Sequence, residues 1–474
     1  MNRLIDNWQM SRRDLLSRSA HGIGAMALWN LLAQDRLLPA STLGQPHFPP
    51  KAKNVIFIFM SGGPSHLDLF DPKPKMAALH GEPVPESLTM SLADPLIRTS
   101  ARVMASPRTF KPYGQSGIEF SDYVPRVGEM ADDICLIRSM HCDQSNHDPA
   151  QLLMSCGTPL FGNPSMGSWV TYGLGTESRD MPGYVVLLSN SGKGVDAGSA
   201  LWGSGFMPST YRGVTFRSSG DPVLHLASPP GITRETQRAR LDVLKDLNQL
   251  HRDETGDAEI DSRIAAYELA FRMQSAAPEL LDFGQETAET RAMYGLDNDT
   301  TRPFGTNCLL ARRMVERGVR FVQLFHSTWD DHGNLNKNLK INCDMTDLPA
   351  AGMLRDLKQR GLLDETLVVW AGEFGRTPMG EVRRGTSPGA EGRDHHPFAF
   401  SLWMAGGGLK RGHVHGKTDD FGYNVVENPM HVHDFQATIL HLLGIDHERL
   451  TYRHSGRDYR LTDIAGNVVH EIIA

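Results

Sequence analysis

The sequence lacks the cysteine pattern of a disulfide framework or a zinc knuckle. Its five cysteines are Cys135, Cys142, Cys156, Cys308 and Cys343. None of them forms a Cys-x-x-Cys pair, and their odd number leaves at least one thiol free or paired between chains. We therefore expect neither a small disulfide-stabilised domain nor a structural cysteine–zinc site.

An excess of basic charge and a dinucleotide-binding turn are also missing. The chain has 48 basic and 55 acidic residues, a formal net charge of -7. This mild acidity argues against a nucleic-acid partner and against a polybasic membrane binder. The best strand candidate is not followed by the Gly-x-Gly-x-x-Gly spacing of a dinucleotide site. With 474 residues, 40% of them hydrophobic, the chain is long enough for a large core.

No apolar run is long enough to span a bilayer comfortably. The modest run Ile23–Leu32 contains Gly24 and Asn30, and it follows the pair Arg12-Arg13. A basic region, a short apolar region and small residues behind it are typical of a signal peptide, here of the twin-arginine type. An amphipathic surface helix is the alternative. We expect residues 1–45 to be signal peptide and linker, and the protein to be periplasmic or otherwise extracytoplasmic, with no stable transmembrane segment after signal removal.

Short apolar runs predict the strands of a sheet covered on both faces. Helical segments between them, such as Leu348–Arg360 ahead of Gly361, favour parallel strands with helical crossovers. The pattern predicts an α/β domain over residues 46–474, with a helical insertion at about 230–295. The predicted strands are Asn54–Met60, Ile134–Arg138, Tyr184–Leu188, Arg320–Phe325, Leu367–Trp370 and Phe398–Met404.

Acidic residues and histidines follow several predicted strands. Because ligand sites in open parallel sheets form beyond the carboxyl ends of the strands, these side chains are expected to share one crevice. Unpaired buried carboxylates would be costly, so such a cluster predicts one or two divalent metal ions. For any one of these runs, a helix cap or a solvated loop is the alternative. The residues are His66, Asp68, His147, Asp148, Asp330, Asp331, His332, Glu373, His395 and His396.

Several longer motifs resemble a known family. They are FMSGGPSHLDLFDPKP (Phe59–Pro74), NHDPAQLLMSCG (Asn146–Gly157), WDDHGNL (Trp329–Leu335), LKQRGLLDETLVVWAGEFGRTP (Leu357–Pro378), GRDHHPFAFSLWMAGGG (Gly392–Gly408) and HDFQATILHLLGID (His433–Asp446). The chain resembles the exported family called domain of unknown function 1501, within the alkaline-phosphatase-like and sulfatase superfamily. This resemblance implies a three-layer fold, a mostly parallel sheet between helices, and a metal crevice that hydrolyses phosphate or sulfate esters.

The resemblance also implies site residues, with three departures. Ser61 stands where an aspartate usually follows the first strand, and Phe374 stands where a second metal histidine would follow the acid. The sulfatase nucleophile motif is absent, and its place falls around Ser145–Pro149. Metal ligands are implied at His66, Asp68, Asp330, His332, Glu373, and His395 or His396.

The sequence therefore predicts a metal-dependent hydrolase of sulfate or phosphate esters, acting on an anionic small molecule or a polysaccharide ester. The metal would be zinc, calcium or manganese. Arg376 would hold an anionic oxygen in bidentate fashion, and His147 would act as an acid, with His395 or His396 as alternatives. Ser145 is a candidate nucleophile, with Ser65 or a metal-bound water as alternatives. The competing hypotheses are a catalytically degenerate protein that binds anionic glycans and a structural partner in an exported assembly.

Overall fold

The computed structural model describes residues 44–89, 101–189, 194–217, 230–381 and 389–474, together with Val223, Leu226 and Ser228. The Arg12-Arg13 pair of the expected signal peptide lies outside these residues. Within the described ranges, no helix is both long enough and apolar enough to cross a membrane.

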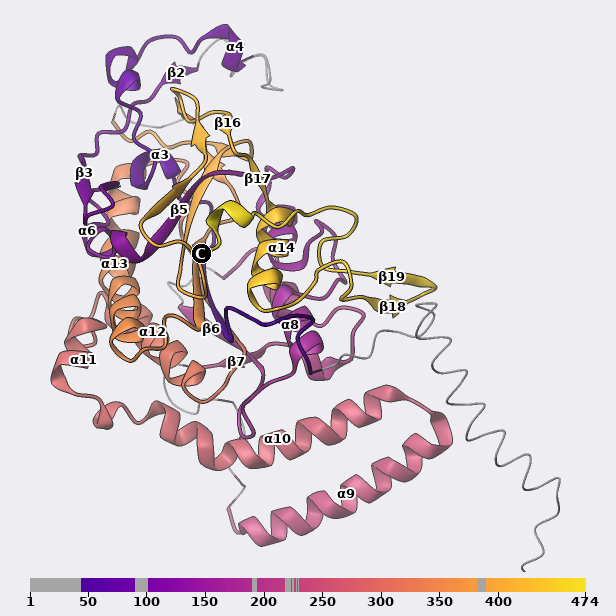
Figure 1. Ribbon diagram of the computed structural model, residues 1–474. Helices are drawn as coiled ribbons and strands as arrows, with labels where there is room; N and C mark the ends of the chain where they lie inside the picture. Colours follow the sequence, from indigo (N-terminus) through magenta and orange to yellow (C-terminus); the bar gives the residue numbers. More distant parts are fainter. Residues whose placement is uncertain are drawn as a thin grey trace, which may run out of the picture.

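A nine-stranded sheet forms the centre of the protein (Figure 1). Its order is β14-β5-β13-β9-β1-β8-β6-β7, with β17 beside β5. All six predicted strands occur in it, with ends shifted by at most three residues. The strands are β1 (Asn54–Met60), β5 (Ile134–His141), β6 (Tyr184–Ser189), β7 (Val214–Phe216), β8 (Phe321–His326), β9 (Thr366–Ala371), β13 (Phe400–Ala405), β14 (His413–His415) and β17 (Met430–His431).

Most strands are parallel, but β13 runs antiparallel to both of its neighbours, β9 and β5. The described part of the connection from β9 to β13 contains only short strands and no crossover helix: β10 (Gly375–Arg376), β11 (Met379–Gly380) and β12 (His395–His396). A chain that returns without a crossover must reverse its direction. The carboxyl end of β9 and the amino end of β13 therefore lie at the same edge, and the prediction of a mostly parallel sheet is confirmed.

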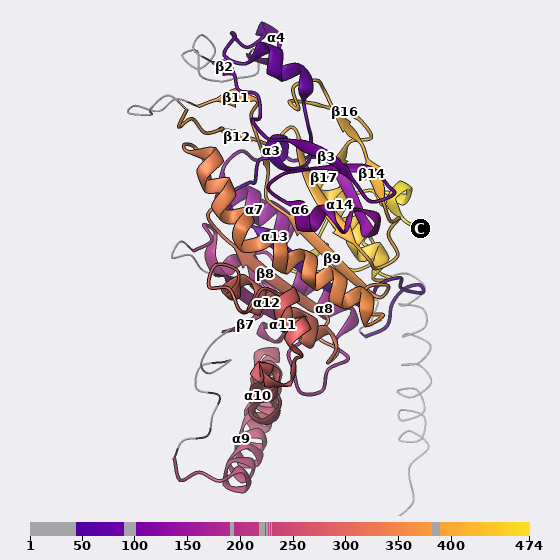
Figure 2. The same cartoon turned by 90° about the vertical axis from the view of Figure 1, so that its left-hand side faces the viewer.

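Two hydrophobic cores lie on the two faces of the sheet. The side chains of β1 alternate between them, with Ile56, Ile58 and Met60 in one and Val55, Phe57 and Phe59 in the other, because successive residues of a strand face opposite sides. Helices α12 (Arg302–Val315) and α13 (Leu335–Gln359) contribute to the first core (Figure 2). Helices α7 (His147–Cys156), α8 (Met166–Leu174) and α14 (Val432–Leu442) contribute to the second. The predicted three-layer arrangement is confirmed.

Helix α13 is longer than the prediction, which began at Leu348. Leu348-Pro349 is typical of a first helical turn, yet the helix starts at Leu335 and continues through Pro349. Buried Leu335, Leu339 and Cys343 tie this earlier part to the core. The burial of these side chains outweighs the low helix propensity of the asparagines between them.

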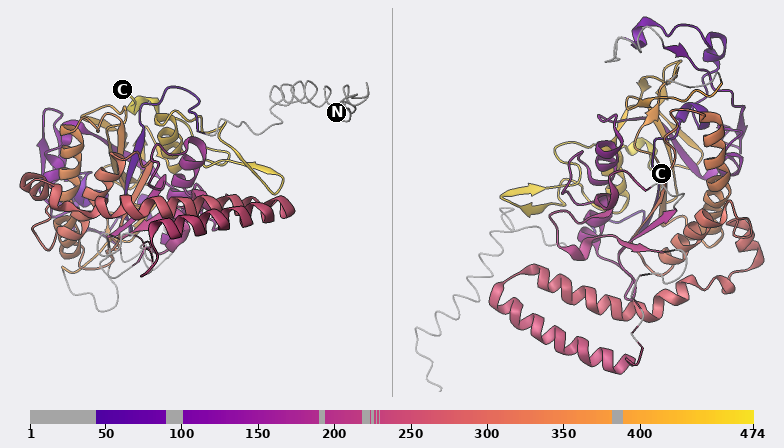
Figure 3. Two further views of the ribbon diagram at one scale, coloured as in Figure 1. Left: turned by 90° about the horizontal axis from the view of Figure 1, so that it is seen from below. Right: turned by 180° about the vertical axis from the view of Figure 1, so that it is seen from behind.

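Two long helices, α9 (Arg234–Thr255) and α10 (Ala258–Leu281), form a hairpin that projects from the body (Figure 3). They occupy the stretch in which we expected a helical insertion, and α11 (Ala288–Met293) follows. Met273, Ala277 and Leu280 of α10 reach the first core. The remaining short elements are β2 (Arg102–Val103), β3 (Phe110–Tyr113), β4 (Ile118–Ser121), β15 (Lys417–Thr418), β16 (Val425–Glu427), β18 (Tyr452–His454), β19 (Arg457–Tyr459), α3 (His66–Leu69), α4 (Glu86–Thr89) and α6 (Pro125–Gly128).

Candidate metal centre

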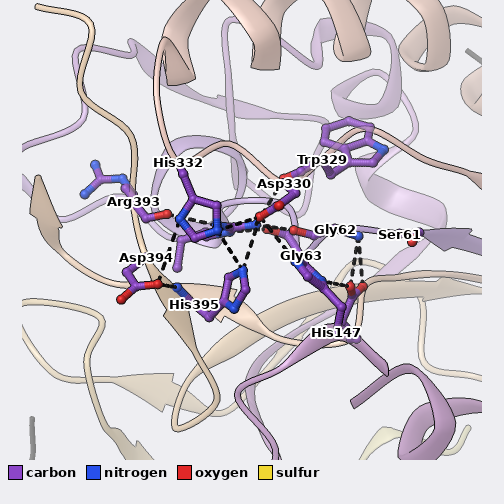
Figure 4. Close-up of polar contacts among 12 residues, drawn as sticks. Ser61, Gly62, Gly63, His147, Trp329, Asp330, His332, Arg393, Asp394 and His395 are labelled. Carbon is purple, nitrogen blue, oxygen red and sulfur yellow. Dashed lines mark hydrogen bonds and ion pairs between the residues drawn. The ribbon is translucent and has the colours of Figure 1, made fainter. Parts of the chain in front are cut away.

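Asp330 lies at the centre of a polar cluster at the edge where β8 and β9 end (Figure 4). Its Oδ1 atom is 2.9 Å from Nε2 of His332, 3.1 Å from Nε2 of His395 and 3.2 Å from Nε2 of His147. Asp330 and His332 follow β8, His147 begins α7 after β5, and His395 lies in β12. The carboxyl ends of the parallel strands thus bring together residues that are far apart in the sequence.

The second ring nitrogen of each histidine points at a fixed acceptor. The Nδ1 atoms lie 2.7 Å from Oε1 of Glu373 for His147, 2.5 Å from Oε2 of Glu381 for His332, and 2.7 Å from the carbonyl oxygen of Ser145 for His395. Carbonyl and carboxylate oxygens only accept, so each Nδ1 carries the hydrogen. In its neutral form each ring therefore presents the lone pair of its Nε2 atom to the centre, which is the tautomer that ligates a metal.

The lone pairs in the cluster face one another. Nε2 of His332 lies 3.0 Å from Nε2 of His395, and the buried Nε2 of His147 makes no aligned hydrogen bond. Acceptors at such distances repel unless a cation lies between them. Four ligands bound tetrahedrally to zinc at about 2.0–2.1 Å are separated from one another by roughly 3.3 Å. The separations around Asp330 are close to this value, so the four residues fit a divalent metal.

The charges of the cluster are strongly coupled. Burial opposes the ionisation of Asp330, but the three imidazoles and Arg376 hold the pKa of its carboxyl well below the usual range. Burial alone would lower the pKa of His147, yet its contacts with Asp330 and Glu373 raise that pKa to about 9. The cluster therefore attracts positive charge, whether a proton or a metal.

The residues of the cluster are partly exposed to solvent. The side chains of His147, Asp330, His332 and His395 are 14–21% exposed. Structural zinc sites are closed, whereas catalytic sites keep a position open to water or substrate. The ring of Phe374 lies against two of the imidazoles, with centroids 5.1 Å from His147 and 4.5 Å from His395, and so supports them from one side.

The glycines after β1 allow a close approach of the loop that carries Asp330. Gly62 has a φ of +120°, and a Cβ atom there would lie 2.4 Å from the backbone nitrogen of Asp330. Its own N–H donates to Oε1 of Glu373 at 2.9 Å. A side chain at this position would push the loop away, so the sequence needs glycine here.

Arg376 does not have the role that the sequence suggested. It is fully buried, and it donates to the carbonyl oxygens of Gly63 at 2.8 Å, of Arg393 at 2.9 Å, and of Gly62. Its Nη2 atom also contacts Oδ1 of Asp330 at 2.8 Å. With its donors committed in this way, the guanidinium cannot hold a substrate anion in bidentate fashion; it fixes Asp330 and the glycine turn instead.

Of the expected metal ligands, Glu373 lies behind the ring of His147 and not at the centre. Three others lie outside the cluster. The contacts that hold them are His66 Nε2 to the Gly422 carbonyl at 3.0 Å, His396 Nε2 to the Tyr423 carbonyl at 2.5 Å, and Asp68 to Arg393 at 2.8 Å. His396 misses the centre because neighbouring residues of a strand point to opposite sides, and His395 already faces it. The expectation that His66 and His396 share a crevice with Asp330 is corrected accordingly. Glu373 contacts His147, and Ser145 reaches the cluster through its carbonyl group.

Gln151 and Glu381 also belong to the site, although neither was predicted from the sequence. Gln151 donates to Oε1 of Glu373 at 3.1 Å and to Oγ of Ser61 at 2.9 Å. It lies four residues after His147, so both face the same side of α7, and this spacing was the available signal. Glu381 contacts His332 although the two residues are 49 positions apart in the sequence, so no local sequence pattern predicts this pair.

Comparisons with solved structures find weak likenesses. The lipoteichoic acid synthase LtaP from Listeria monocytogenes is 10% identical with a TM-score of 0.35, covering 88% of this chain and 76% of its own. The alkaline phosphatase of the Antarctic bacterium TAB5 is 11% identical with a TM-score of 0.34, covering 83% and 98%. The PsFucS1 sulfatase from Pseudoalteromonas sp. is 12% identical with a TM-score of 0.33, covering 91% and 72%. Likenesses at these TM-scores carry no functional conclusion.

No curated protein matches the sequence. The family model described as "Protein of unknown function (DUF1501)" matches residues 52–473, which is most of the chain. The protein therefore belongs to the DUF1501 family.

Proposed function

We propose that this protein is a metal-dependent hydrolase of sulfate or phosphate esters. The observation that carries the proposal is the convergence of three imidazole Nε2 atoms on Oδ1 of Asp330, among side chains that are each 14–21% exposed. A closed structural site would not need this exposure.

The ligand set favours zinc among the metals considered. Three imidazole nitrogens and one carboxylate suit zinc, whereas calcium prefers an all-oxygen shell. His147, His332, His395 and Asp330 would hold the ion. A bound metal would supply Lewis-acid polarisation of the ester oxygen.

The two candidate serine nucleophiles, Ser65 and Ser145, differ in whether a substrate could reach them. Ser65 is buried, and its hydroxyl donates to Asp68 at 2.5 Å, so it is not available to a substrate. Ser145 is exposed, and its carbonyl oxygen lies 2.7 Å from Nδ1 of His395, next to the ring whose Nε2 faces the centre. His147, expected as a general acid, faces the centre with Nε2 and is assigned here as a ligand. Ser145 and water are the remaining nucleophiles.

We further propose that the protein is exported by the twin-arginine route and acts outside the cytoplasm. The support is the Arg12-Arg13 pair ahead of a weak apolar run. The substrate would be an anionic small-molecule or polysaccharide ester.

The test is turnover of a panel of aryl sulfates and aryl phosphates by zinc- or manganese-loaded protein. We expect hydrolysis of at least one ester, a loss of about 100-fold or more in His395→Ala, and near-normal rates in His396→Ala as a matched control. Loss of activity in Ser145→Ala would indicate a covalent route, and retained activity would indicate water. A metal-loaded protein that hydrolyses none of the esters but binds sulfated glycans would refute the proposal and support the glycan-binding alternative.

A further inference from the structure

Helix α9 carries its large apolar side chains on a solvent-facing surface. Val243, Leu244, Leu247 and Leu250 are 59%, 43%, 57% and 63% exposed, and no residue of α9 is buried. Val243, Leu247 and Leu250 follow the spacing of one helical stripe. Contiguous exposed apolar side chains of this size mark an interaction surface. We refer to residues 240–254 on this side of α9 as the outer stripe.

The outer stripe faces away from the rest of the protein because α9 packs on α10 with its polar side. Arg238 pairs with Glu268 through two hydrogen bonds of 2.8 and 2.7 Å, and Arg252 pairs with Asp261 at 3.0 Å. Leu247 lies nine residues after Arg238, about two and a half turns, and is therefore on the opposite side. The views agree that α10 lies between α9 and the body (Figures 1 and 3).

Charge along the outer stripe is arranged symmetrically about Leu247. Arg240 lies seven residues before it and Glu254 seven residues after it, each about two turns away on the same side. No ion pair is recorded for either side chain among the described residues. In an antiparallel pair of α9 helices with a two-fold axis at Leu247, Arg240 of each copy faces Glu254 of the other. Leu244 then lies against Leu250 across the interface.

We propose that α9 packs antiparallel against α9 of a second copy of this chain, giving a two-fold symmetric dimer. The same surface on both copies is what an isologous dimer requires. The contact is short, about 21 Å from residue 240 to residue 254, so it belongs with small, reversible interfaces. The hairpin lies at the end of the molecule opposite β12, so the dimer leaves the metal centre open (Figure 2).

Sedimentation velocity of the full chain over a concentration series tests the dimer. We expect a concentration-dependent monomer–dimer equilibrium that shifts to monomer in Leu247→Asp. Arg240→Glu and Glu254→Arg alone should each weaken association by about 10-fold or more, because each places like charges together twice. The double variant should regain most of the wild-type affinity, which a misfolded helix would not do.

Disulfide trapping checks the position of the axis. All five native cysteines are buried and free, so Leu247→Cys should form a disulfide-linked dimer on mild oxidation. Gln249→Cys, about 160° away around the helix, should not. The proposal is overturned if the wild-type protein stays monomeric up to about 100 μM, or if Leu247→Asp leaves the dimer unchanged. The outer stripe would then bind a partner other than a second copy of this chain.

Discussion

Glu373 allows charge and hydrogen bonding at the metal centre to be tested separately. It is fully buried, and its Oε1 atom accepts from Nδ1 of His147 at 2.7 Å, from the Gly62 N–H at 2.9 Å and from Nε2 of Gln151 at 3.1 Å. Its Oε2 atom contacts the Gly62 N–H at 3.2 Å. A glutamine with its carbonyl oxygen at the position of Oε1 therefore keeps all three donors to that atom and removes the negative charge, while its amide nitrogen replaces the weaker acceptor of the Gly62 N–H.

We expect Glu373→Gln to lower zinc affinity by about 10-fold and Glu373→Ala by about 100-fold, the range for groups that orient metal ligands. These factors correspond to about 1.4 and 2.7 kcal/mol. The alanine variant also leaves the buried N–H of Gly62 and Nδ1 of His147 without the acceptor that Glu373 supplies. Each unsatisfied donor costs roughly 1–3 kcal/mol, so the free energy of unfolding should fall in Glu373→Ala and much less in Glu373→Gln.

Competition with a chromophoric chelator measures zinc affinity, and urea denaturation of the metal-free protein measures stability. Glu365→Gln is the matched control, because Glu365 is half-exposed and pairs with Lys53 at 2.8 Å at the far end of β9. Wild-type zinc affinity in both Glu373 variants would refute the argument that Glu373 holds His147 as a ligand.

Three further results are expected. His395→Ala should lose bound zinc while His396→Ala keeps it, as measured by elemental analysis; equal loss would contradict the placement of the two rings. Burial raises the pKa of Asp347 to about 7 from its ordinary value of 3.8. Its protonated form therefore stabilises the fold fully below pH 3.8, and this contribution of at most roughly 4 kcal/mol is lost as the pH rises through 7. Asp347→Asn should flatten the fall in urea stability between pH 5 and pH 8, and an unchanged slope would contradict the assignment. Replacing Arg12 and Arg13 with lysine should leave precursor in the cytoplasm, and normal export in cell fractionation would exclude the twin-arginine route.

The sheet was predictable because its strands are buried on both faces. The strands Asn54–Met60 and Thr366–Ala371 carry uninterrupted apolar side chains after their first residue, and their burial in two cores matches that pattern. The direction of β13 was not predictable from such a run. It depends on the connection from β9. The short strands of this connection pair with segments that are not adjacent in the sequence, β10 with β12 and β11 with β2.

The position of the candidate metal centre at the strand ends was predictable, but the identity of all its ligands was not. Asp330, His332 and His395 were identified because strand ends converge. The choice between His395 and His396 depends on how β12 pairs with β10, with Arg376 opposite His395 and Gly375 opposite His396. Arg376 looked like an anion ligand because sequence does not show that backbone carbonyls already occupy its donors.

X-ray absorption spectroscopy of zinc-loaded protein tests the central claim most directly. The account predicts one zinc ion per chain, with three imidazole nitrogens and one carboxylate oxygen at about 2.0–2.1 Å. The signal should lose one imidazole or disappear in His332→Ala and stay unchanged in His396→Ala. Protein that contains no metal and gains none on incubation with zinc, manganese or calcium would contradict the assignment of the centre and, with it, the proposed hydrolase function.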